Sequence, residues 1–259
     1  MTAAGQTAAW IEPLARLGYA AKALLYGTIA LLAGQAALGL GGGATDTSGA
    51  MAAIARAPFG RALLALCSLG LVGYAVWRAI AAVTDAENRG HDLKGLTLRF
   101  SFLARALFHL VLAWSAARVA LGLTAVSRQK ISAAADYGDL ILLAVGTGVA
   151  GYGIYQLYRS WTAKLSRQID HSEMRREAGN WVYPVARFGI AARGIVFCLI
   201  GYLTIRAGLS AAVDDGGGLR ESLQVFVDTG RLPLGLMAGG LLAYAFYEGL
   251  NVRYREIRT

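Results

Sequence analysis

The chain has 259 residues, of which 56% are hydrophobic and only 16% are charged, and its mean hydropathy is +0.47. Soluble domains carry about 25% charged residues, so this composition excludes an ordinary water-soluble protein and indicates that a bilayer surrounds much of the chain. The formal net charge of +9 does not indicate nucleic-acid binding, because the basic residues lie at predicted helix ends and in short loops without forming one patch.

The segment Met1–Pro13 is polar and rich in Ala, and it lacks the charged and apolar regions of a signal peptide. The first span is therefore expected to act as an uncleaved insertion signal. Six apolar segments are long enough, or nearly so, to cross ~30 Å of hydrocarbon as helices. They are predicted at about 18–40, 60–83, 100–124, 138–158, 188–212 and 233–251. Cys67 and Cys198 fall inside these segments, where they are expected to act as small apolar residues.

The chain repeats itself three times, with two predicted helices in each repeat. The first helices open with Arg16, Arg99 and Arg187, and a second basic residue follows six positions later in each. The second helices share the pattern Gly-x-x-Gly/Ala-Tyr-x-x-Trp/Tyr. Its residues are Gly70, Gly73, Tyr74 and Trp77 in the first repeat, Gly148, Gly151, Tyr152 and Tyr155 in the second, and Gly240, Tyr244 and Tyr247 in the third.

Together with a Gly-rich loop that leads into Ala57-Pro58-Phe59-Gly60, these motifs resemble the bacterial membrane family known as domain of unknown function 1206. The resemblance covers nearly the whole chain. It implies three copies of a paired transmembrane helix, and it implies no activity, cofactor or catalytic residue. The middle repeat departs from the pattern, because Thr124–Asp139 lacks the Gly-rich loop.

The predicted fold is an all-α membrane domain over residues 1–259, with repeats at about 16–83, 99–158 and 187–251. Successive repeats enter the membrane from the same side, so they are parallel and are expected to pack as a bundle with pseudo-three-fold symmetry. Short helices are predicted on the outer face at 47–57 and 219–229, with a more polar counterpart at Ser127–Tyr137. Thirteen Lys and Arg residues lie near the two chain ends and in the loops on the same side of the membrane, and six lie in the loops on the opposite side. The side with more basic residues is expected to face the cytoplasm, so both termini are predicted in the cytoplasm of a bacterium, at its cytoplasmic membrane.

The shared positions of the second helices lie at i, i+3, i+4 and i+7, which is one helical face. Small residues on such a face let another helix approach closely, and the aromatic rings fill the space beside the contact. The motif is therefore interpreted as helix packing, with an aromatic-lined groove for a lipid tail or pigment as the alternative. The packing interpretation predicts that Leu in place of Gly73 or Gly151 disrupts the bundle.

Cationic residues recur on the first helices in two sets. The inner set is Lys22, Arg105 and Arg193, and the outer set is Gln35, Arg118 and Arg206, thirteen residues further on. Thirteen residues give a net rotation of roughly 220°, so at most one set points into the bundle. Long basic side chains near helix ends usually extend to the lipid headgroups. The alternative is a ring of cations that binds an anionic headgroup or a small anion, formed by Lys22, Arg105 and Arg193 or by Arg118 and Arg206.

Two further residues stand out inside the predicted spans. His109 occupies the position of Tyr26 and Phe197 in the other repeats, which favours a hydrogen-bonded packing residue over a haem or chlorin ligand. Glu248 matches Arg78 and Gln156, and an ion pair between Arg78 and Glu248 is expected. No known enzyme motif or metal-binding cysteine pair is present, so no catalytic residue, metal or cofactor is predicted.

The sequence favours a non-enzymatic scaffold or accessory protein that acts through helix packing. The alternative is an anionic-lipid-binding protein or small-solute channel that uses the basic residues of the first helices. Membrane lipids are the expected partners in either case, and a scaffold would in addition bind another membrane protein or a second copy of this chain.

Overall fold

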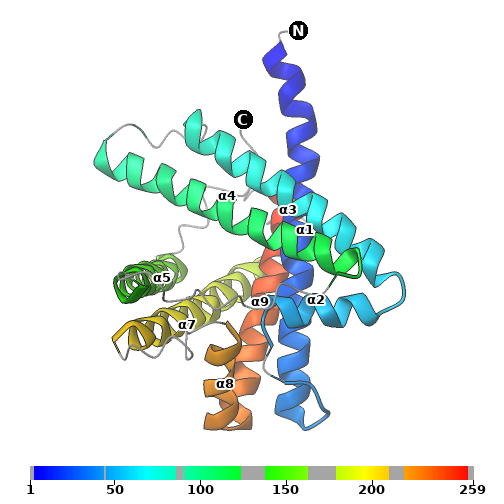
Figure 1. The fold of residues 1–259 in the computed structure, drawn as a ribbon, viewed down its shortest axis with the longest axis vertical. Coiled ribbons are helices and arrows are strands. Elements are labelled where there is room, and N and C mark those ends of the chain that lie inside the picture. Colours follow the sequence, from blue (N-terminus) through cyan, green and yellow to red (C-terminus); the bar gives the residue numbers. More distant parts are fainter. Residues whose placement is uncertain are drawn as a thin grey trace.

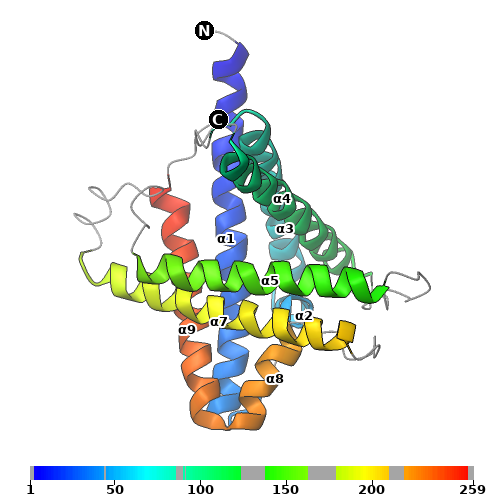
Figure 2. The same ribbon diagram turned by 90° about the vertical axis from the view of Figure 1, so that its left-hand side faces the viewer.

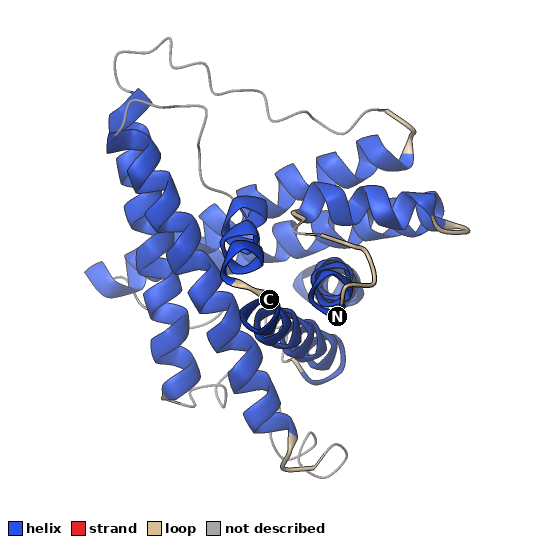
Figure 3. Ribbon diagram, turned by 90° about the horizontal axis from the view of Figure 1, so that it is seen from below, coloured by secondary structure: helices blue, strands red, loops and turns tan. Residues whose placement is uncertain are grey.

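The computed structural model describes residues 3–43, 45–85, 90, 92–123, 138–162, 179–209 and 219–255. Within these ranges the chain is all-helical and contains no strand (Figure 3). Two short helices are α2 (Thr47–Arg56) and α8 (Leu219–Thr229). The six long helices are α1 (Ala3–Leu38), α3 (Gly60–Val83), α4 (Leu93–Ala120), α5 (Gly138–Trp161), α7 (Val182–Leu209) and α9 (Arg231–Tyr254).

The helix boundaries follow local sequence signals. Asp46 and Asp92 cap the first turns of α2 and α4, since their carboxylates accept hydrogen bonds from the backbone N–H groups of Gly49 and Gly95 at 2.9 and 3.0 Å. The short helices predicted at 47–57 and 219–229 are confirmed as α2 and α8. The prediction for 127–137 lies outside the described residues. The expected start of the first helix was wrong, because α1 begins at Ala3 and continues through Pro13.

Five helices in the described part of the chain are long and apolar enough to cross a membrane: α1, α3, α4, α5 and α7. Large apolar side chains on these helices face outward, as on Leu69, Leu107 and Ile154, which are 61%, 65% and 62% exposed. This pattern is expected of a surface that lipid covers. The sixth long helix, α9, falls outside this set; Glu248 and Asn251, both buried, lie within it.

The six long helices form an incomplete ring in the order α4, α3, α1, α9, α7 and α5. Each helix packs extensively on the next, but α4 and α5, at the two ends of this order, make no extensive contact in the described structure. Figures 1 and 2 show that the pair of helices α5 and α7 lies across the pair α1 and α9. Helices α1 and α9 run antiparallel, so that α1 begins and α9 ends at the same end of the molecule (Figure 2).

Each contact between successive repeats carries the same arginine cap. Arg99 donates to the carbonyl oxygens of Ala82 and Val83, where α3 ends, at 2.7 and 2.9 Å. Arg187 does the same at the end of α5, with Ser160 and Trp161 as acceptors at 2.7 and 2.9 Å.

Arg16 donates to the carbonyl oxygens of Val252 and Arg253, at the end of α9. These carbonyls have no partner within their own helix, and the helix dipole favours a cation beside them. The three arginines that open the first helices therefore connect each repeat to the one beside it.

Contacts within a repeat depend on glycine in the first and third repeats. A Cβ atom on Gly18 would lie 2.5 Å from the Gly70 carbonyl oxygen, and one on Gly73 would lie 2.4 Å from the Leu14 Cβ. In the third repeat, a Cβ on Gly189 would lie 2.3 Å from the Tyr244 nitrogen, and one on Gly240 would lie 2.2 Å from the Ala192 Cβ. These distances are too short for any larger residue, so the paired helices are in backbone contact.

The middle repeat lacks this contact, and here the packing interpretation was wrong. A Cβ on Gly148 or Gly151 would meet no atom within 4 Å, because α4 does not lie against this face of α5. The position of Gly18 and Gly189 is occupied by Ser101. A serine brings a Cβ atom to the point where the other repeats have room for none, which prevents an equally close approach of the two backbones.

Candidate anion-binding cavity

A cavity of about 750 Å³ lies at the centre of the ring, and all six long helices contribute to its lining. It is placed toward the end of the molecule at which α1 begins and α9 ends, because its lining includes the second half of α3 and α9 and the N-terminal to central parts of α4 and α7. Ser101, Gly148 and Val149, on the two helices that do not pack together, are among its lining residues. The cavity therefore reaches the side of the ring on which α4 and α5 do not pack extensively on each other.

The inner basic set lines this cavity, and the outer set does not. Lys22, Arg105 and Arg193 reach it from α1, α4 and α7. Arg118 and Arg206 lie more than three helical turns further along and are not part of the lining. Lys22 is buried, whereas Arg105 and Arg193 are half-buried.

Each inner cation lies over the tyrosine of its own repeat. The Lys22 nitrogen is 4.9 Å from the centre of the Tyr74 ring, and the guanidinium carbons of Arg105 and Arg193 are 5.3 and 4.6 Å from the rings of Tyr152 and Tyr244. All three pairs are within the range of cation–π attraction. The tyrosines of the Gly-rich motif thus orient the inner cations in addition to filling space beside the helix contacts.

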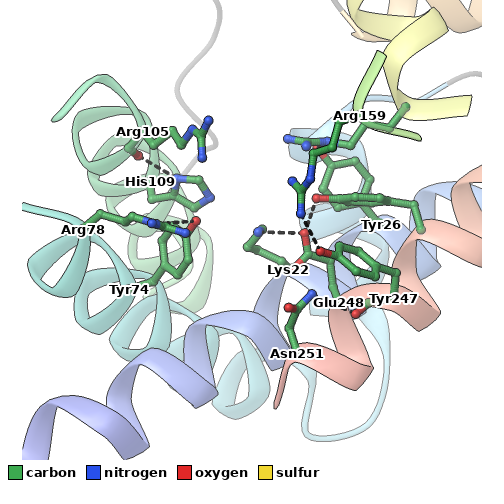
Figure 4. Close-up of polar contacts among 12 residues, drawn as sticks. Lys22, Tyr26, Tyr74, Arg78, Arg105, His109, Arg159, Tyr247, Glu248 and Asn251 are labelled. Atoms are coloured by element: carbon green, nitrogen blue, oxygen red, sulfur yellow. Dashed lines mark hydrogen bonds and ion pairs between the residues drawn. The ribbon is translucent and has the colours of Figure 1, made fainter. Parts of the chain in front are cut away.

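The next turn of each second helix carries the chemically different residues Arg78, Gln156 and Glu248, and all three line the cavity. Glu248 pairs with Lys22 at 2.8 Å and accepts a hydrogen bond from the Tyr244 hydroxyl. The expected ion pair with Arg78 was therefore wrong: Arg78 instead donates to the Tyr74 hydroxyl at 3.2 Å, and its guanidinium carbon lies 4.2 Å from the centre of the Trp77 ring. Figure 4 shows Arg78 and Glu248 on opposite sides of the cluster.

His109 is a hydrogen-bonded packing residue, as the sequence predicts. Its Nδ1 lies 2.7 Å from the Arg105 carbonyl oxygen, and its ring packs on Tyr74 with 4.5 Å between centres. A carbonyl can only accept, so Nδ1 carries the proton and donates. The hydrogen bond holds the imidazole against the wall that also carries Arg105 (Figure 4).

The described lining has a large excess of positive charge. It contains six cationic side chains, Lys22, Arg78, Arg105, Arg159, Arg193 and Arg255, and a single carboxylate, Glu248. Lys22 neutralises that carboxylate. Arg193 donates to the hydroxyls of Tyr26 and Tyr152 at 3.1 and 3.5 Å, which are neutral partners. The guanidinium of Arg105 lies over the rings of Phe102 and Tyr152 and makes no ion pair among the described residues.

Several buried polar atoms of the lining have no hydrogen-bond partner in the described structure. They are the Tyr19 hydroxyl, Gln156 Oε1, Glu248 Oε2 and Asn251 Oδ1, and the four side chains are at most 2% exposed. A buried polar atom without a partner costs free energy, so these atoms mark a part of the cavity built to face polar groups.

The sequence prediction missed Gln156, Arg159, Asn251 and Arg255 as site residues. A signal for the first three was available, because they lie four or seven positions after the repeated tyrosine and so on the same helical face. The residues at these positions differ between the three repeats, so a comparison of the repeats that looks for identical residues does not find them. No group of three or more potential metal ligands occurs in the described ranges.

The model of the family described as Domain of Unknown Function (DUF1206) matches the chain three times, at residues 17–85, 100–163 and 188–255. The chain is also similar to "Uncharacterized protein YxxB" of Bacillus subtilis (strain 168), with 31% identity over 97% of this chain and 94% of the relative. No solved structure matches it. The three matches follow the three repeats read from the sequence, and the chain belongs to the DUF1206 family.

Proposed function

We propose that this protein binds an anionic amphiphile, such as a membrane phospholipid, in the central cavity, with the charged head among the cations and the tails in the opening between α4 and α5. The observation that carries the proposal is the pair Arg105 and Arg193, two lining guanidinium groups that make no ion pair among the described residues. The role is one of binding, without catalysis.

The proposal places six helices across the bacterial cytoplasmic membrane, with α9 as the sixth. All six are at least 24 residues long and would span about 36 Å or more at 1.5 Å per residue, which exceeds the ~30 Å of hydrocarbon. Tilting resolves this mismatch and agrees with the crossing of the helix pairs in Figure 2. The polar residues of α9 face the cavity and the helix packs on α1 and α7, which explains a span of lower hydropathy.

The basic residues near the chain ends support a cytoplasmic position for both termini. The cavity then lies in the cytoplasmic half of the membrane, because it is near the end where α1 begins and α9 ends. The three repeats surround it with pseudo-three-fold symmetry, which is supported by the equivalent positions of the inner cations and of the motif tyrosines.

An anion is the ligand class that fits this electrostatic environment. Ion pairs and charge-assisted hydrogen bonds are stronger in a site shielded from water, and Arg presents a planar fork that matches phosphate oxygens. Leaving an unpaired guanidinium at membrane depth is costly. An anion beside Arg105 and Arg193 would remove that cost and would also satisfy their donors.

An amphiphile fits the shape of the site better than a free anion. The lining near the opening is apolar and aromatic, with Phe100, Phe108 and Val145 beside the polar groups. Leu103 and Leu107 of α4 and Ile141 of α5 are exposed on the outer surfaces of the same two helices. A lipid can therefore place its tails along α4 and α5 while its head enters the cavity.

A scaffold function is less well supported by this arrangement. Gly70, Gly73 and Gly240 make their close contacts inside the chain, so they are not available to a partner. The lining cations have no role in a scaffold that acts by helix packing alone.

The test is native mass spectrometry of the protein released from nanodiscs without delipidation. Arg105→Gln is compared with Arg118→Gln, which removes the same group from the same helix at a half-buried position outside the cavity. We expect a bound amphiphile that resists collisional activation in the wild type and in Arg118→Gln, with retention reduced about ten-fold in Arg105→Gln. Equal retention in the two variants would contradict the proposal.

A further inference from the structure

The cavity has two chemically different sides. The second side restricts the chemistry of the ligand beyond the requirement for a negative charge. Figure 4 shows Arg105 and His109 on one side and Glu248 and Asn251 on the other, next to Lys22. On the first side, the Arg105 guanidinium lies over the rings of Phe102 and Tyr152 and makes no hydrogen bond or ion pair among the described residues. The second side offers oxygen acceptors with no donor of their own, namely Gln156 Oε1, Glu248 Oε2 and Asn251 Oδ1.

The acceptor side is built into the fold. Gln156 and Glu248 are each 2% exposed, and Asn251 is 1% exposed. The Asn251 amide donates to the Tyr247 carbonyl oxygen at 2.9 Å, which fixes its Oδ1 in the opposite direction. The other oxygen of Glu248 is held by Lys22 and the Tyr244 hydroxyl. These contacts fix the side chains without satisfying the three remaining oxygens.

A ligand in the cavity can supply hydrogen-bond donors to the three oxygens, and the charge nearby decides between two kinds of donor. An ammonium group at these oxygens would bring a second positive charge beside Lys22, whose nitrogen already lies 2.8 Å from Glu248, and like charges at short range in a shielded site repel strongly. Hydroxyl groups are neutral donors and avoid this repulsion. A phosphate with hydroxyl groups a few bonds away satisfies both sides of the cavity.

We infer that the ligand is a phosphodiester whose headgroup carries free hydroxyls, with the phosphate at Arg105 and Arg193 and the hydroxyls donating to Gln156, Glu248 and Asn251. Phosphatidylglycerol is the simplest membrane lipid of this chemistry. This inference rests on the proposed function, since it specifies the headgroup of the same anionic amphiphile.

The lipid comparison isolates the hydroxyls from the charge. Phosphatidylglycerol and phosphatidylmethanol with identical tails are both monoanionic phosphodiesters, and only phosphatidylglycerol carries hydroxyls on its headgroup. Competition between them is measured by native mass spectrometry on delipidated protein titrated with defined mixtures. We expect the wild type to prefer phosphatidylglycerol about ten-fold, a ratio that the hydrogen bonds donated by its two headgroup hydroxyls can supply.

The variant comparison assigns the preference to the acceptors. Gln156→Met removes the acceptor while keeping the length of the side chain, and Gln35→Met is the same change at an exposed position outside the cavity. We expect Gln156→Met to reduce the preference to about three-fold or less, and Gln35→Met to leave it unchanged. Asn251→Leu provides a second variant in which the preference should also fall.

The outcomes separate the two proposals. If the wild type binds both lipids equally and Arg105→Gln weakens both, the anion site stands and the hydroxyl inference is wrong. If neither lipid is retained specifically, the proposed function itself fails. A soluble competitor, glycerophosphoglycerol, distinguishes the source of the headgroup: displacement of the lipid at an equal concentration would show that the site takes a free phosphodiester, and would overturn the assignment to a lipid.

Discussion

The first and middle repeats have nearly the same motif on their second helices and use it in opposite ways. In the first repeat, Gly70 and Gly73 lie in backbone contact with Leu17 and Leu14 of α1. In the middle repeat, Gly148 and Gly151 have open space in front of them, and Gly148 lines the cavity. The same small residues therefore close one side of the ring and leave the other accessible.

The difference follows from the partner helix and not from the motif. Gly18 in α1 and Gly189 in α7 permit backbone contact, whereas the equivalent residue of α4 is Ser101. A duplicated motif is thus not evidence of a duplicated contact. In this protein one altered repeat interrupts the ring, and under the proposed function the ligand reaches the cavity there.

The largest expected difference between the two regions is in stability. Gly73→Leu places a side chain into the backbone of α1 near Leu14, and overpacking of this severity should cost about 3 kcal/mol or more. Gly151→Leu meets no neighbour and should leave the thermal unfolding temperature in detergent nearly unchanged. Equal loss of stability in the two variants would show that α4 packs on α5 after all.

The arginine caps should also have unequal effects. Helix α5 packs extensively on α7 alone among the long helices, whereas α9 packs on both α1 and α7. Arg187→Gln removes the cap on α5, and Arg16→Gln removes the equivalent cap on α9, each at a cost of about 1–3 kcal/mol. We expect faster hydrogen exchange confined to α5 in Arg187→Gln, and little local change in α9 in Arg16→Gln. Similar hydrogen-exchange rates in α5 and α9 would mean that α5 is held by a contact other than the arginine cap and its packing on α7.

Closing the open side should slow ligand exchange without unfolding the protein. Cysteines in place of Ser101 and Gly148, joined by a short bis-maleimide in a variant lacking Cys67 and Cys198, would connect α4 to α5. We expect exchange of bound lipid with added vesicles to slow about ten-fold on cross-linking, because the headgroup can no longer pass between the helices. The two single-cysteine variants treated with the same reagent are the controls, and an unchanged rate would locate the path elsewhere.

The smallest expected effect comes from Ser101→Gly, which restores the residue found in the other two repeats. If Ser101 alone kept the helices apart, α5 would approach α4 and narrow the cavity. Other lining side chains, such as Phe100, remain between the helices, so we expect only a two- to three-fold loss of lipid retention, roughly 0.5 kcal/mol. Retention equal to that of the wild type would show that the serine contributes nothing to the opening.

Much of the fold could be predicted from the sequence, because apolar length and internal repetition are local signals. The segment predicted at 60–83 coincides with α3, and the outer helices α2 and α8 were found from their turn and apolar patterns. The rotation between the two basic sets also showed that both could not face one cavity. These inferences depend only on the period of a helix.

The open side and the mixed chemistry of the site could not be predicted in the same way. Whether Gly148 packs depends on a residue about fifty positions earlier, Ser101, and on how two helices approach in space. The pairing of Glu248 with Lys22 instead of Arg78 likewise depends on α1 and α9 being adjacent. Such contacts join distant segments, and periodicity within one helix carries no information about them.

Photo-crosslinking with a lipid that carries a diazirine near the glycerol end of its acyl chain tests the central claim most directly. Irradiation of the wild-type protein in nanodiscs is followed by peptide mass spectrometry to locate the adducts. Binding in the cavity predicts adducts concentrated on lining residues such as Phe108 and Val149, and fewer of them in Arg105→Gln. Adducts found only on outward residues such as Leu69 and Ile154, with the same yield in Arg105→Gln, would show that lipid surrounds the protein without entering it.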